Sequence, residues 1–269
     1  MGFGSFLARE VTAGYDQKVI VDGVSMVLPK GKISVIIGAN ACGKSTLLKT
    51  FARLLKPMAG SVLLDGKQIH ALPSRQLART LGLLPQTPVV PEGITVSDLV
   101  SRGRFPHQTF LKGMGKKDFE AVEEALVLMG IAELANRSVD ELSGGQRQRV
   151  WIAMALAQGT DILLLDEPTT YLDIAYQVEI LDLLTDLNRK RGSTIVMVLH
   201  DINLSARYAD HIFALRAGKL IAEGPPGEVI TDQLIRDVFE LECMVIRDPV
   251  SQSPFIVPRG RYHVEAAKA

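Results

Sequence analysis

GANACGKST, residues 38–46, is the most informative stretch of this 269-residue chain. It fits the pattern G-x-x-x-x-G-K-[S/T], and it lies between the apolar run ISVII and the helical pattern TLLKTFARLL. The glycines of such a loop let several backbone N–H groups converge on phosphate oxygens, and the following helix adds the positive end of its dipole. The sequence therefore predicts a strand, a phosphate-binding loop and a helix in succession.

Individual side chains of this loop have distinct expected roles. Lys44 can reach the β- and γ-phosphates of a nucleotide, and the hydroxyl of Ser45 is suited to bind Mg²⁺. The other residues expected to surround the phosphates are Gly38, Asn40, Gly43 and Thr46. The loop thus indicates a nucleoside triphosphate that is bound together with Mg²⁺.

A second motif, ILLLDEP at residues 162–168, is an apolar run that ends in two acids. In a parallel sheet, the carboxyl ends of the strands meet at the edge where a phosphate-binding loop lies. We therefore expect Asp166 to hold Mg²⁺ through its water shell. We expect Glu167 to act as the general base on the water that attacks the γ-phosphate. Taken alone, the two acids could also form a solvated turn.

A third motif, ELSGGQRQRV at residues 141–150, is a second glycine-rich helix start. Ser143 can cap the helix, and Gly144 and Gly145 expose backbone N–H groups to an anion. Since the chain already has one phosphate-binding loop, we expect this helix to complete the site of a second copy. Two chains packed head to tail about a two-fold axis would then share two nucleotides. A capped helix without a ligand is the alternative.

The order of strand and helix patterns predicts an α/β fold. Short runs rich in Val and Ile lie near the N-terminus, and SVLLDGKQI adds a strand–turn–strand. DILLLDE and STIVMVLH are typical of parallel strands buried on both faces, and AYQVEILDLLTDLNRKRG between them has helical periodicity. Residues 88–159 are expected to be largely helical. One buried helix face is expected to carry Phe119, Val122, Leu126 and Met129.

Composition argues against several classes of protein. Thirty basic residues balance thirty acidic ones, so there is no electrostatic reason to expect nucleic acid as a partner. Cys42 and Cys243 are far apart and indicate neither a disulfide framework nor a zinc site. The N-terminus lacks the pattern of a secretory signal, and no apolar run approaches the roughly 20 residues of a membrane span. We expect a cytoplasmic chain.

With LSGGQ between the phosphate-binding loop and LLLDEP, the chain resembles the ATP-binding cassette (ABC) ATPases over residues 6–240. The resemblance implies a P-loop core with a parallel sheet, an N-terminal antiparallel β subdomain and an inserted α-helical subdomain. We expect the core at 1–87 and 160–240, the helical subdomain at 88–159 and a short C-terminal extension at 241–269. The resemblance also implies ATP with Mg²⁺, and a dimer that closes on ATP and is coupled to membrane partners.

The resemblance assigns roles to further residues. Tyr15 matches the aromatic that stacks on adenine, and a strand aromatic in the core is the alternative. Gln86, in LLPQ, matches the glutamine that reaches Mg²⁺ and the attacking water. His200 matches the switch histidine that contacts the γ-phosphate. Asp173, in TTYLD, matches the aspartate that links the two sites of the dimer, and Gln146 completes LSGGQ.

Two departures from the family pattern lie within the phosphate-binding loop. Ala39 and Ala41 stand where Pro and Gly are frequent. Alanine normally avoids positive φ angles, so we expect Ala41 to hold the backbone at ordinary φ values. The expected consequence is a modest change in nucleotide affinity without its loss. The pentapeptide TTYLD is a third departure, because the family more often has Ser-Ala there.

RGRFPH and TTYLDI resemble the ATPase subunits of bacterial importers for iron(III)-siderophore complexes, and importers of haem or vitamin B12 are the close alternatives. In such importers a transmembrane permease would dock near Gln86 and the segment from Ile94 to His107, and a substrate-binding protein would deliver the cargo. Arg102 to His107 could instead form a solvated loop. The chain would be a peripheral subunit on the cytoplasmic face of the inner membrane.

Two other classes fit the sequence less well. Soluble ABC ATPases of DNA repair or translation usually have coiled-coil insertions, zinc cysteines, tandem cassettes or a basic surplus, and this sequence has none of these. A nucleotide switch that does not hydrolyse ATP should lack Glu167 or His200, and both are present. An importer ATPase is therefore the favoured interpretation.

Overall fold

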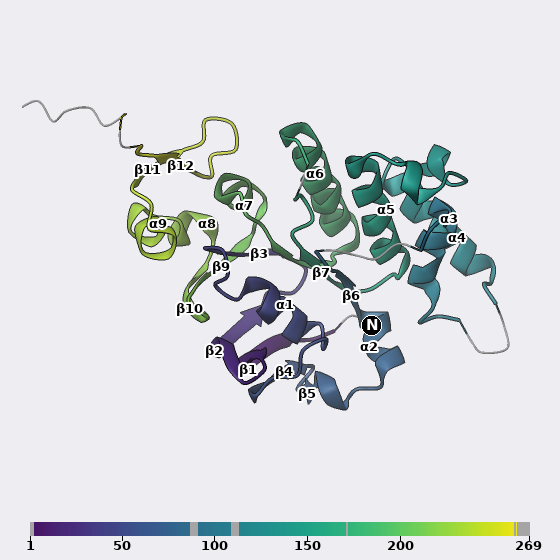
Figure 1. Ribbon diagram of the computed structural model, residues 1–269, viewed down its shortest axis with the longest axis horizontal. Helices are drawn as coiled ribbons and strands as arrows, with labels where there is room; N and C mark the ends of the chain where they lie inside the picture. The colour runs from purple at the N-terminus through teal and green to yellow at the C-terminus, as the bar shows by residue number, and fades with distance from the viewer. Residues whose placement is uncertain (1–2, 87–90, 109–112, 171, 261, 263–269) are drawn as a thin grey trace, which may run out of the picture.

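The computed structural model describes residues 3–86, 91–108, 113–170, 172–260 and 262 (Figure 1). The predicted boundary between residues 87 and 88 and the end of the predicted extension fall outside the described residues. The central layer is a six-stranded sheet with the order β10-β9-β3-β8-β7-β6. Its strands are β3 (Ile33–Gly38), β6 (Leu81–Leu84), β7 (Ile162–Asp166), β8 (Thr194–Val198), β9 (His211–Arg216) and β10 (Lys219–Gly224).

Five of these strands are parallel, and β10 is antiparallel to its neighbour β9. The sequences of β7 and β8 are continuous apolar runs, buried throughout, because both faces of the sheet are covered there. Successive side chains alternate between two cores. Val35 and Leu163 belong to the core shared with most of the helices, whereas Ile36 and Leu164 belong to the core shared with the N-terminal sheet. The predicted burial of both faces is thereby confirmed.

The second sheet is antiparallel, has the order β2-β1-β4-β5, and lies at the bottom of Figure 1. Asp65 and Gly66 form the predicted turn between β4 and β5. Helix α1 (Lys44–Phe51) contacts both sheets, and the Phe51 ring meets Phe6 edge-on with 5.0 Å between centroids. The strands are β1 (Phe6–Tyr15), β2 (Lys18–Leu28), β4 (Ala59–Leu64) and β5 (Lys67–Gln68). This is the predicted N-terminal antiparallel subdomain.

A group of helices lies beyond the β6 edge of the central sheet, on the right of Figure 1. It consists of α3 (Val96–Ser101), α4 (Lys116–Leu128) and α5 (Gly144–Ala157), which pack against one another. Two further helices, α6 (Ile174–Arg191) and α7 (Ile202–Tyr208), cover one face of the sheet, and α2 (Ser74–Thr80) precedes β6. The predicted α/β fold with a helical insertion is confirmed.

The buried face predicted for α4 is correct except at its first residue. Val122, Leu126 and Met129 are each at most 5% exposed, but Phe119 is 60% exposed. Phe119 lies in the first turn of α4, at the edge of the buried stripe. Helical spacing gives the direction of a side chain, but it does not show where the neighbouring elements end.

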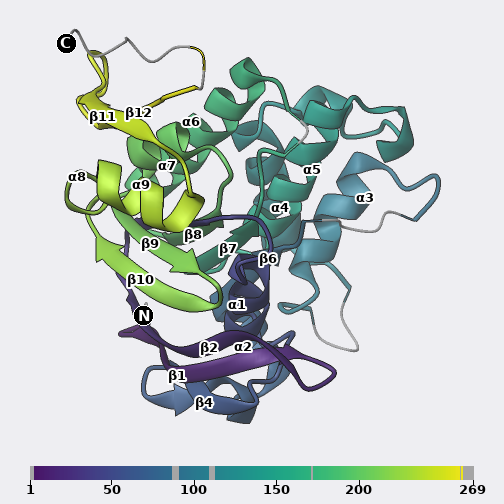
Figure 2. The same cartoon turned by 60° about the vertical axis from the view of Figure 1, so that its left-hand side comes forward.

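The C-terminal part of the chain packs beside β9 and β10 (Figure 2). It comprises the helices α8 (Pro226–Val229) and α9 (Asp232–Phe239) and the hairpin of β11 (Cys243–Arg247) and β12 (Pro254–Pro258). The hairpin contacts α7 and α9. In the described part of the chain, no helix combines the length and the apolar character that crossing a membrane would require.

Candidate functional site

The phosphate-binding loop connects β3 to α1. Gly38 and Gly43 have φ angles of 154° and 106°, which favour glycine. A Cβ atom on Gly38 would lie 2.3 Å from the carbonyl oxygen of Leu215, so no larger residue fits there. The buried Lys44 donates from Nζ to the carbonyl oxygens of Gly38 at 2.8 Å and Ala39 at 3.0 Å. The lysine ammonium therefore lies directly over the loop.

The expectation that Ala41 keeps an ordinary φ angle is wrong, because its φ is 60°. A left-handed conformation costs a residue with a Cβ atom about 1–2 kcal/mol. Backbone hydrogen bonds around it hold the loop in this form: Cys42 N donates to Ala39 O at 3.3 Å, and Gly218 N donates to Cys42 O at 2.9 Å. The alanine thus follows a backbone course that glycine adopts more easily.

Asp166 ends β7 next to the loop, and Ser45 Oγ donates to Asp166 Oδ1 at 2.8 Å. Burial raises the pKa of Asp166 above its usual range; the Ser45 hydrogen bond opposes this, and the charge of Glu167 adds to it. A hydroxyl and a nearly enclosed carboxylate are hard oxygen ligands of the kind that Mg²⁺ prefers. A dication would also compensate the buried negative charge. Ser45 and Asp166 therefore fit a magnesium ion.

Glu167 is the centre of a hydrogen-bonded cluster. Gln86 Nε2 donates to Glu167 Oε2 at 2.7 Å, and Thr170 Oγ1 donates to the same oxygen at 3.0 Å. His200 Nε2 lies 2.7 Å from Oε1. Gln86 follows β6, Glu167 follows β7 and His200 follows β8, so neighbouring parallel strands bring these groups to one edge of the sheet. Glu167 itself has a φ of 56°, in the left-handed region.

These elements line a pocket of about 490 Å³. Its walls are formed by Tyr15, Ile20, Asn40, Ala41, Cys42, Gly43, Lys44, Ser45, Thr46, Gln86, Glu167 and His200. Tyr15 is 45% exposed, which excludes the alternative that it is a core residue. Most residues predicted from the phosphate-binding loop, the adenine contact and the catalytic group therefore lie around one cavity.

The signature loop, residues 143–146, is not part of that lining. Ser143 caps α5 as predicted: Gln146 N donates to Ser143 Oγ at 3.3 Å, and Ser143 N donates to Gln146 Oε1 at 3.1 Å. This reciprocal pair is a capping box. Ser143 and Gly144 are exposed. Within this chain, the signature loop is thus a stable helix start on the surface.

Asp173 also lies outside the pocket lining. It caps α6, where Tyr176 N donates to Asp173 Oδ1 at 3.1 Å. The Tyr176 ring packs on the signature loop, since a Cβ atom on Gly145 would be 3.5 Å from Tyr176 Cδ1. Tyr176 is 44% exposed, and Ile174 beside it is 74% exposed. The signature loop and the start of α6 therefore form one continuous exposed surface.

The stretch from Arg102 to His107 is not the solvated loop considered as an alternative. It follows α3 and begins with a 3₁₀ turn at Arg102–Arg104. Arg104 is buried, and its Nε donates to Asp118 Oδ1 at 2.9 Å. Phe105 next to it is 63% exposed. The segment therefore presents an aromatic side chain on an anchored backbone.

Three side chains in or beside the pocket were not predicted: Thr170, Ile20 and Cys42. Thr170 is three residues after Glu167, a spacing at which a hydroxyl can reach back to the carboxylate in a turn, so the sequence held a signal for it. Ile20 and Cys42 line the pocket itself, whereas Thr170 contacts it through Glu167. No local pattern points to Ile20, because the packing of β2 against the loop brings it there.

Residues 21–170 match the protein family described as ABC transporter, and this is more than half of the chain. The chain belongs to the ABC transporter family. As an ATPase of this family, it combines the phosphate-binding loop, the acidic strand end and the signature loop in the expected order.

This ABC ATPase is similar to named relatives over nearly its whole length. The achromobactin transport ATP-binding protein CbrD of Dickeya dadantii (strain 3937) is 54% identical over 254 residues, 94% of each chain. The ferric enterobactin transport ATP-binding protein FepC of Escherichia coli (strain K12) is 50% identical over 253 residues, 94% of this chain and 93% of that one. The dimeric structure of MJ0796, a bacterial ABC transporter cassette, has a TM-score of 0.73 at 29% identity and covers 82% of this chain and 98% of its own.

Proposed function

We propose that this ABC ATPase hydrolyses ATP between two copies of itself and thereby drives the import of iron(III)-siderophore complexes. The observation that carries the hydrolytic part is the cluster of Gln86, Glu167 and His200 beside the phosphate-binding loop. The cargo is supported by relatives that are named for achromobactin and ferric enterobactin transport. Haem and vitamin B12 are the alternative cargoes.

In this proposal the pocket of about 490 Å³ holds ATP. Tyr15 stacks on the adenine, and Lys44 neutralises the β- and γ-phosphates. The phosphates are further held by Gly38, Asn40, Gly43, Ser45 and Thr46. Mg²⁺ would be held by Ser45, Gln86 and Asp166, and it would supply charge neutralisation on the phosphate oxygens. Because Asp166 is buried, its attraction for Mg²⁺ would be stronger than it would be in water.

Glu167 is the proposed general base. Its carboxylate has about four lone-pair positions, and Gln86, Thr170 and His200 occupy three of them. A water molecule can therefore bind as the fourth donor. Glu167 takes a proton from that water while the water oxygen bonds to the γ-phosphorus. The bond from the γ-phosphorus to the β–γ bridging oxygen breaks, and this oxygen leaves with ADP. His200 and Gln86 orient the carboxylate and contact the γ-phosphate side of the site.

We further propose that a second copy completes each site. The signature loop and Asp173 share one exposed surface but do not line the chain's own pocket. A head-to-tail dimer would bring Ser143, Gly144, Gly145 and Gln146 of one copy to the ATP of the other, with Asp173 linking the two sites. The exposed Ile174 and Tyr176 would become buried in such a dimer.

The membrane partners belong to the same proposal. A transmembrane permease would dock near Gln86 and the segment from Ile94 to His107, where exposed Phe105 offers an anchor. The core (1–87 and 160–240) would bind ATP, and the helical subdomain (88–159) would transmit its state to the permease. A substrate-binding protein would act indirectly, and the chain would be peripheral on the cytoplasmic face of the inner membrane.

Purification of the chain from its native cells in mild detergent tests the transport function. We expect a multi-spanning permease to be recovered with the wild-type chain and to be depleted with Phe105→Ala. Phe119→Ala, which removes an equally exposed aromatic on α4, is the control. Stimulation of ATP hydrolysis in the reconstituted complex by an iron(III)-siderophore and its binding protein, but not by haem or vitamin B12, would identify the cargo. Recovery of only ribosomal or DNA-bound proteins would contradict the proposal.

A further inference from the structure

His200 lies in the short connection between strand β8 and helix α7, which are held in different ways. Strand β8 before it pairs in parallel with β3 and β7, so the sheet fixes its end. Helix α7 after it begins at Ile202 and has seven residues. A helix of this length is not stable without tertiary contacts, because nucleation of its first turn is unfavourable. The position of His200 therefore depends on the contacts that hold α7.

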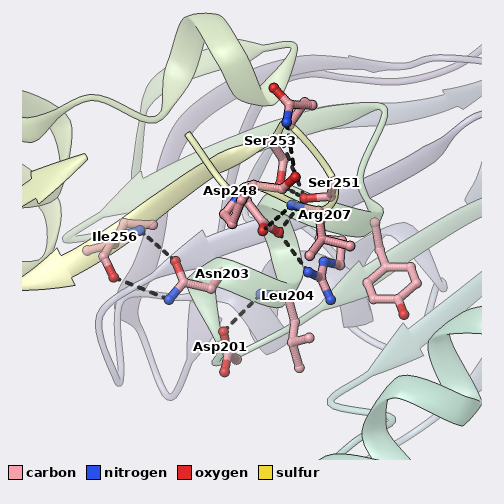
Figure 3. Close-up of polar contacts among 12 residues, drawn as sticks. Asp201, Asn203, Leu204, Arg207, Asp248, Ser251, Ser253 and Ile256 are labelled. Carbon is pink, nitrogen blue, oxygen red and sulfur yellow. Dashed lines mark hydrogen bonds and ion pairs between the residues drawn. The ribbon is translucent and has the colours of Figure 1, made fainter. Parts of the chain in front are cut away.

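The first of these contacts joins α7 to β12 (Figure 3). Asn203 Nδ2 donates to the carbonyl oxygen of Ile256 at 3.3 Å, and the Ile256 N–H donates to Asn203 Oδ1 at 2.7 Å. The amide of Asn203 thus pairs with a strand backbone in the manner of a neighbouring strand. The Ile256 side chain is 4% exposed and belongs to the same core as Leu204.

The second contact lies one helical turn further along α7. Arg207 Nη2 donates to Asp248 Oδ2 at 2.7 Å, and the side chain of Asp248 is only 9% exposed. Asp248 is in the turn of the hairpin, where it also accepts hydrogen bonds from the Ser251 hydroxyl and, at 3.0 Å, from the Val250 N–H. Together with Arg207, these donors lower the pKa of Asp248 below its usual range, so the ion pair persists at neutral pH.

These two contacts are on one face of α7, since residues 203 and 207 are four apart. Two further contacts complete the setting of the helix. Asp201 caps its start, where Leu204 N donates to Asp201 Oδ1 at 2.9 Å. At its end, Tyr208 Oη donates to Asp182 Oδ1 of α6 at 2.8 Å. The C-terminal hairpin thus holds one side of a helix that begins two residues after His200.

We infer that the β11–β12 hairpin positions His200 for ATP hydrolysis, with Asn203 and Arg207 as the positioning residues. None of the hairpin residues lines the ATP pocket. Of the two helices that the hairpin contacts, α7 and α9, α7 is the one that begins beside His200, whose Nε2 is 2.7 Å from Glu167. The inference rests on the role proposed above for His200. It predicts that loosening the hairpin slows turnover and leaves ATP binding intact.

The test uses Asn203→Leu, which keeps the size of the side chain and removes both hydrogen bonds, and Asp248→Ala, which removes the ion pair from the hairpin side. We expect each variant of the full chain to lower kcat by about tenfold, because small displacements of a catalytic group are costly. We expect the KM for ATP to change by less than about twofold, since Tyr15 and Lys44 are unaffected. Thermal unfolding checks that the variants fold. If Asp248→Ala does not fold, Asp248→Asn is used in its place.

Glu242→Ala is the matched control, because it breaks the Arg236–Glu242 ion pair in the same C-terminal region, where no partner belongs to α7. It should leave kcat unchanged. In chain labelled with ¹³C-histidine, the ring signal of His200 should shift in Asn203→Leu and Asp248→Ala but not in Glu242→Ala. An unshifted His200 signal, an unchanged kcat in a folded variant, or a loss shared equally with Glu242→Ala would overturn the inference.

His200→Ala separates this inference from the function on which it rests. If His200→Ala retains wild-type turnover, the proposed role of His200 in hydrolysis fails. The His200 ring signal still reports on whether the hairpin sets its position. If His200→Ala loses turnover while Asn203→Leu and Asp248→Ala retain it, the hairpin link fails and the hydrolytic role of His200 stands.

Discussion

The phosphate-binding loop and the signature loop are both glycine-rich starts of a helix, but they differ in what surrounds them. The phosphate-binding loop faces a pocket that also contains Gln86, Glu167 and His200. The signature loop faces solvent, and Ser143 and Gln146 satisfy each other in a capping box. One helix start thus has Gln86, Glu167 and His200 beside it, and the other packs against the exposed start of α6.

This difference supports the proposal that two copies of the chain act together. The parallel sheet gathers the acid, amide and imidazole groups at the ends of adjacent strands, so one chain supplies all of the groups to which we assign the attacking water. The signature loop is held by α5 and by Tyr176, at a surface that the sheet does not reach. In the proposed function, the chain therefore carries two separate parts: the group around Glu167, called the catalytic half, and the signature loop, called the anion-binding half.

The largest expected effect comes from Glu167→Gln, which breaks the catalytic half alone. Turnover should fall about 10²–10⁴-fold because the general base is lost, while ATP binding should persist. ATP-bound dimers should then accumulate, as a shift to larger size in chromatography. Glu228→Gln, a change at an exposed glutamate of α8, should have no effect. Wild-type turnover in Glu167→Gln would remove Glu167 as the base.

A smaller effect, on the free energy of unfolding, is expected from Asp166→Asn. This variant sharpens the comparison because it tests the electrostatic cost of the catalytic half. Because burial raises the pKa of Asp166, its charged form destabilises the folded chain. Without nucleotide at pH 7, the variant should have a free energy of unfolding higher by about 1 kcal/mol. It should also lose ATP hydrolysis, because the amide is a poorer ligand for Mg²⁺.

The gain in the free energy of unfolding that we expect for Asp166→Asn should become smaller as the pH falls. The pKa of Asp166 is higher in the folded chain than the ordinary Asp value of about 3.9. Protonated Asp166 therefore contributes its full stability to the folded wild type below about pH 3.9. This contribution is lost as the pH rises through the pKa of the folded chain. The difference between wild type and Asp166→Asn should therefore shrink on acidification. Denaturant unfolding at pH 7 and at lower pH measures it. An equal difference at all pH values would contradict the burial argument.

The smallest effect is expected from Ala41→Gly, which relieves the left-handed φ of 60° in the phosphate-binding loop. The free energy of unfolding should rise by about 0.5–1 kcal/mol, since the relief exceeds the added freedom of the unfolded chain. Ala39→Gly is the control, because Ala39 has no positive φ. This variant should lower the free energy of unfolding by about 0.5–1 kcal/mol, because glycine adds freedom to the unfolded chain. Opposite signs in the two variants would support the argument, and equal signs would contradict it.

The sequence predicts those parts of the molecule that depend on neighbouring residues. The parallel strands, the turn at Asp65 and Gly66 and the cap at Ser143 all follow from local patterns and are present in the structure. Ala41 was mispredicted because the hydrogen bond that the distant Gly218 donates to Cys42, together with the local one from Cys42 to Ala39, outweighs its local φ preference. Phe119 was mispredicted because its exposure depends on where the packed surface ends.

The C-terminal hairpin shows the same limit more clearly. Its length and composition suggested only a short extension, yet Asp248 and Ile256 meet Arg207 and Asn203 across more than forty residues. No spacing rule connects such positions, because the pairing arises only after the sheet and α7 have formed. The sequence alone therefore located the catalytic half but not the elements that hold it in place.

The central claim is that each ATP site combines the phosphate-binding loop of one copy with the signature loop of another. Its most direct test is the ATPase activity of an equal mixture of Ser143→Arg and Lys44→Ala chains. Each variant alone should be inactive, and the mixture should recover about a quarter of wild-type activity, since half of the dimers would be mixed and each would have one intact site. A mixture no more active than either parent, at concentrations where mixed dimers are detected, would contradict the account.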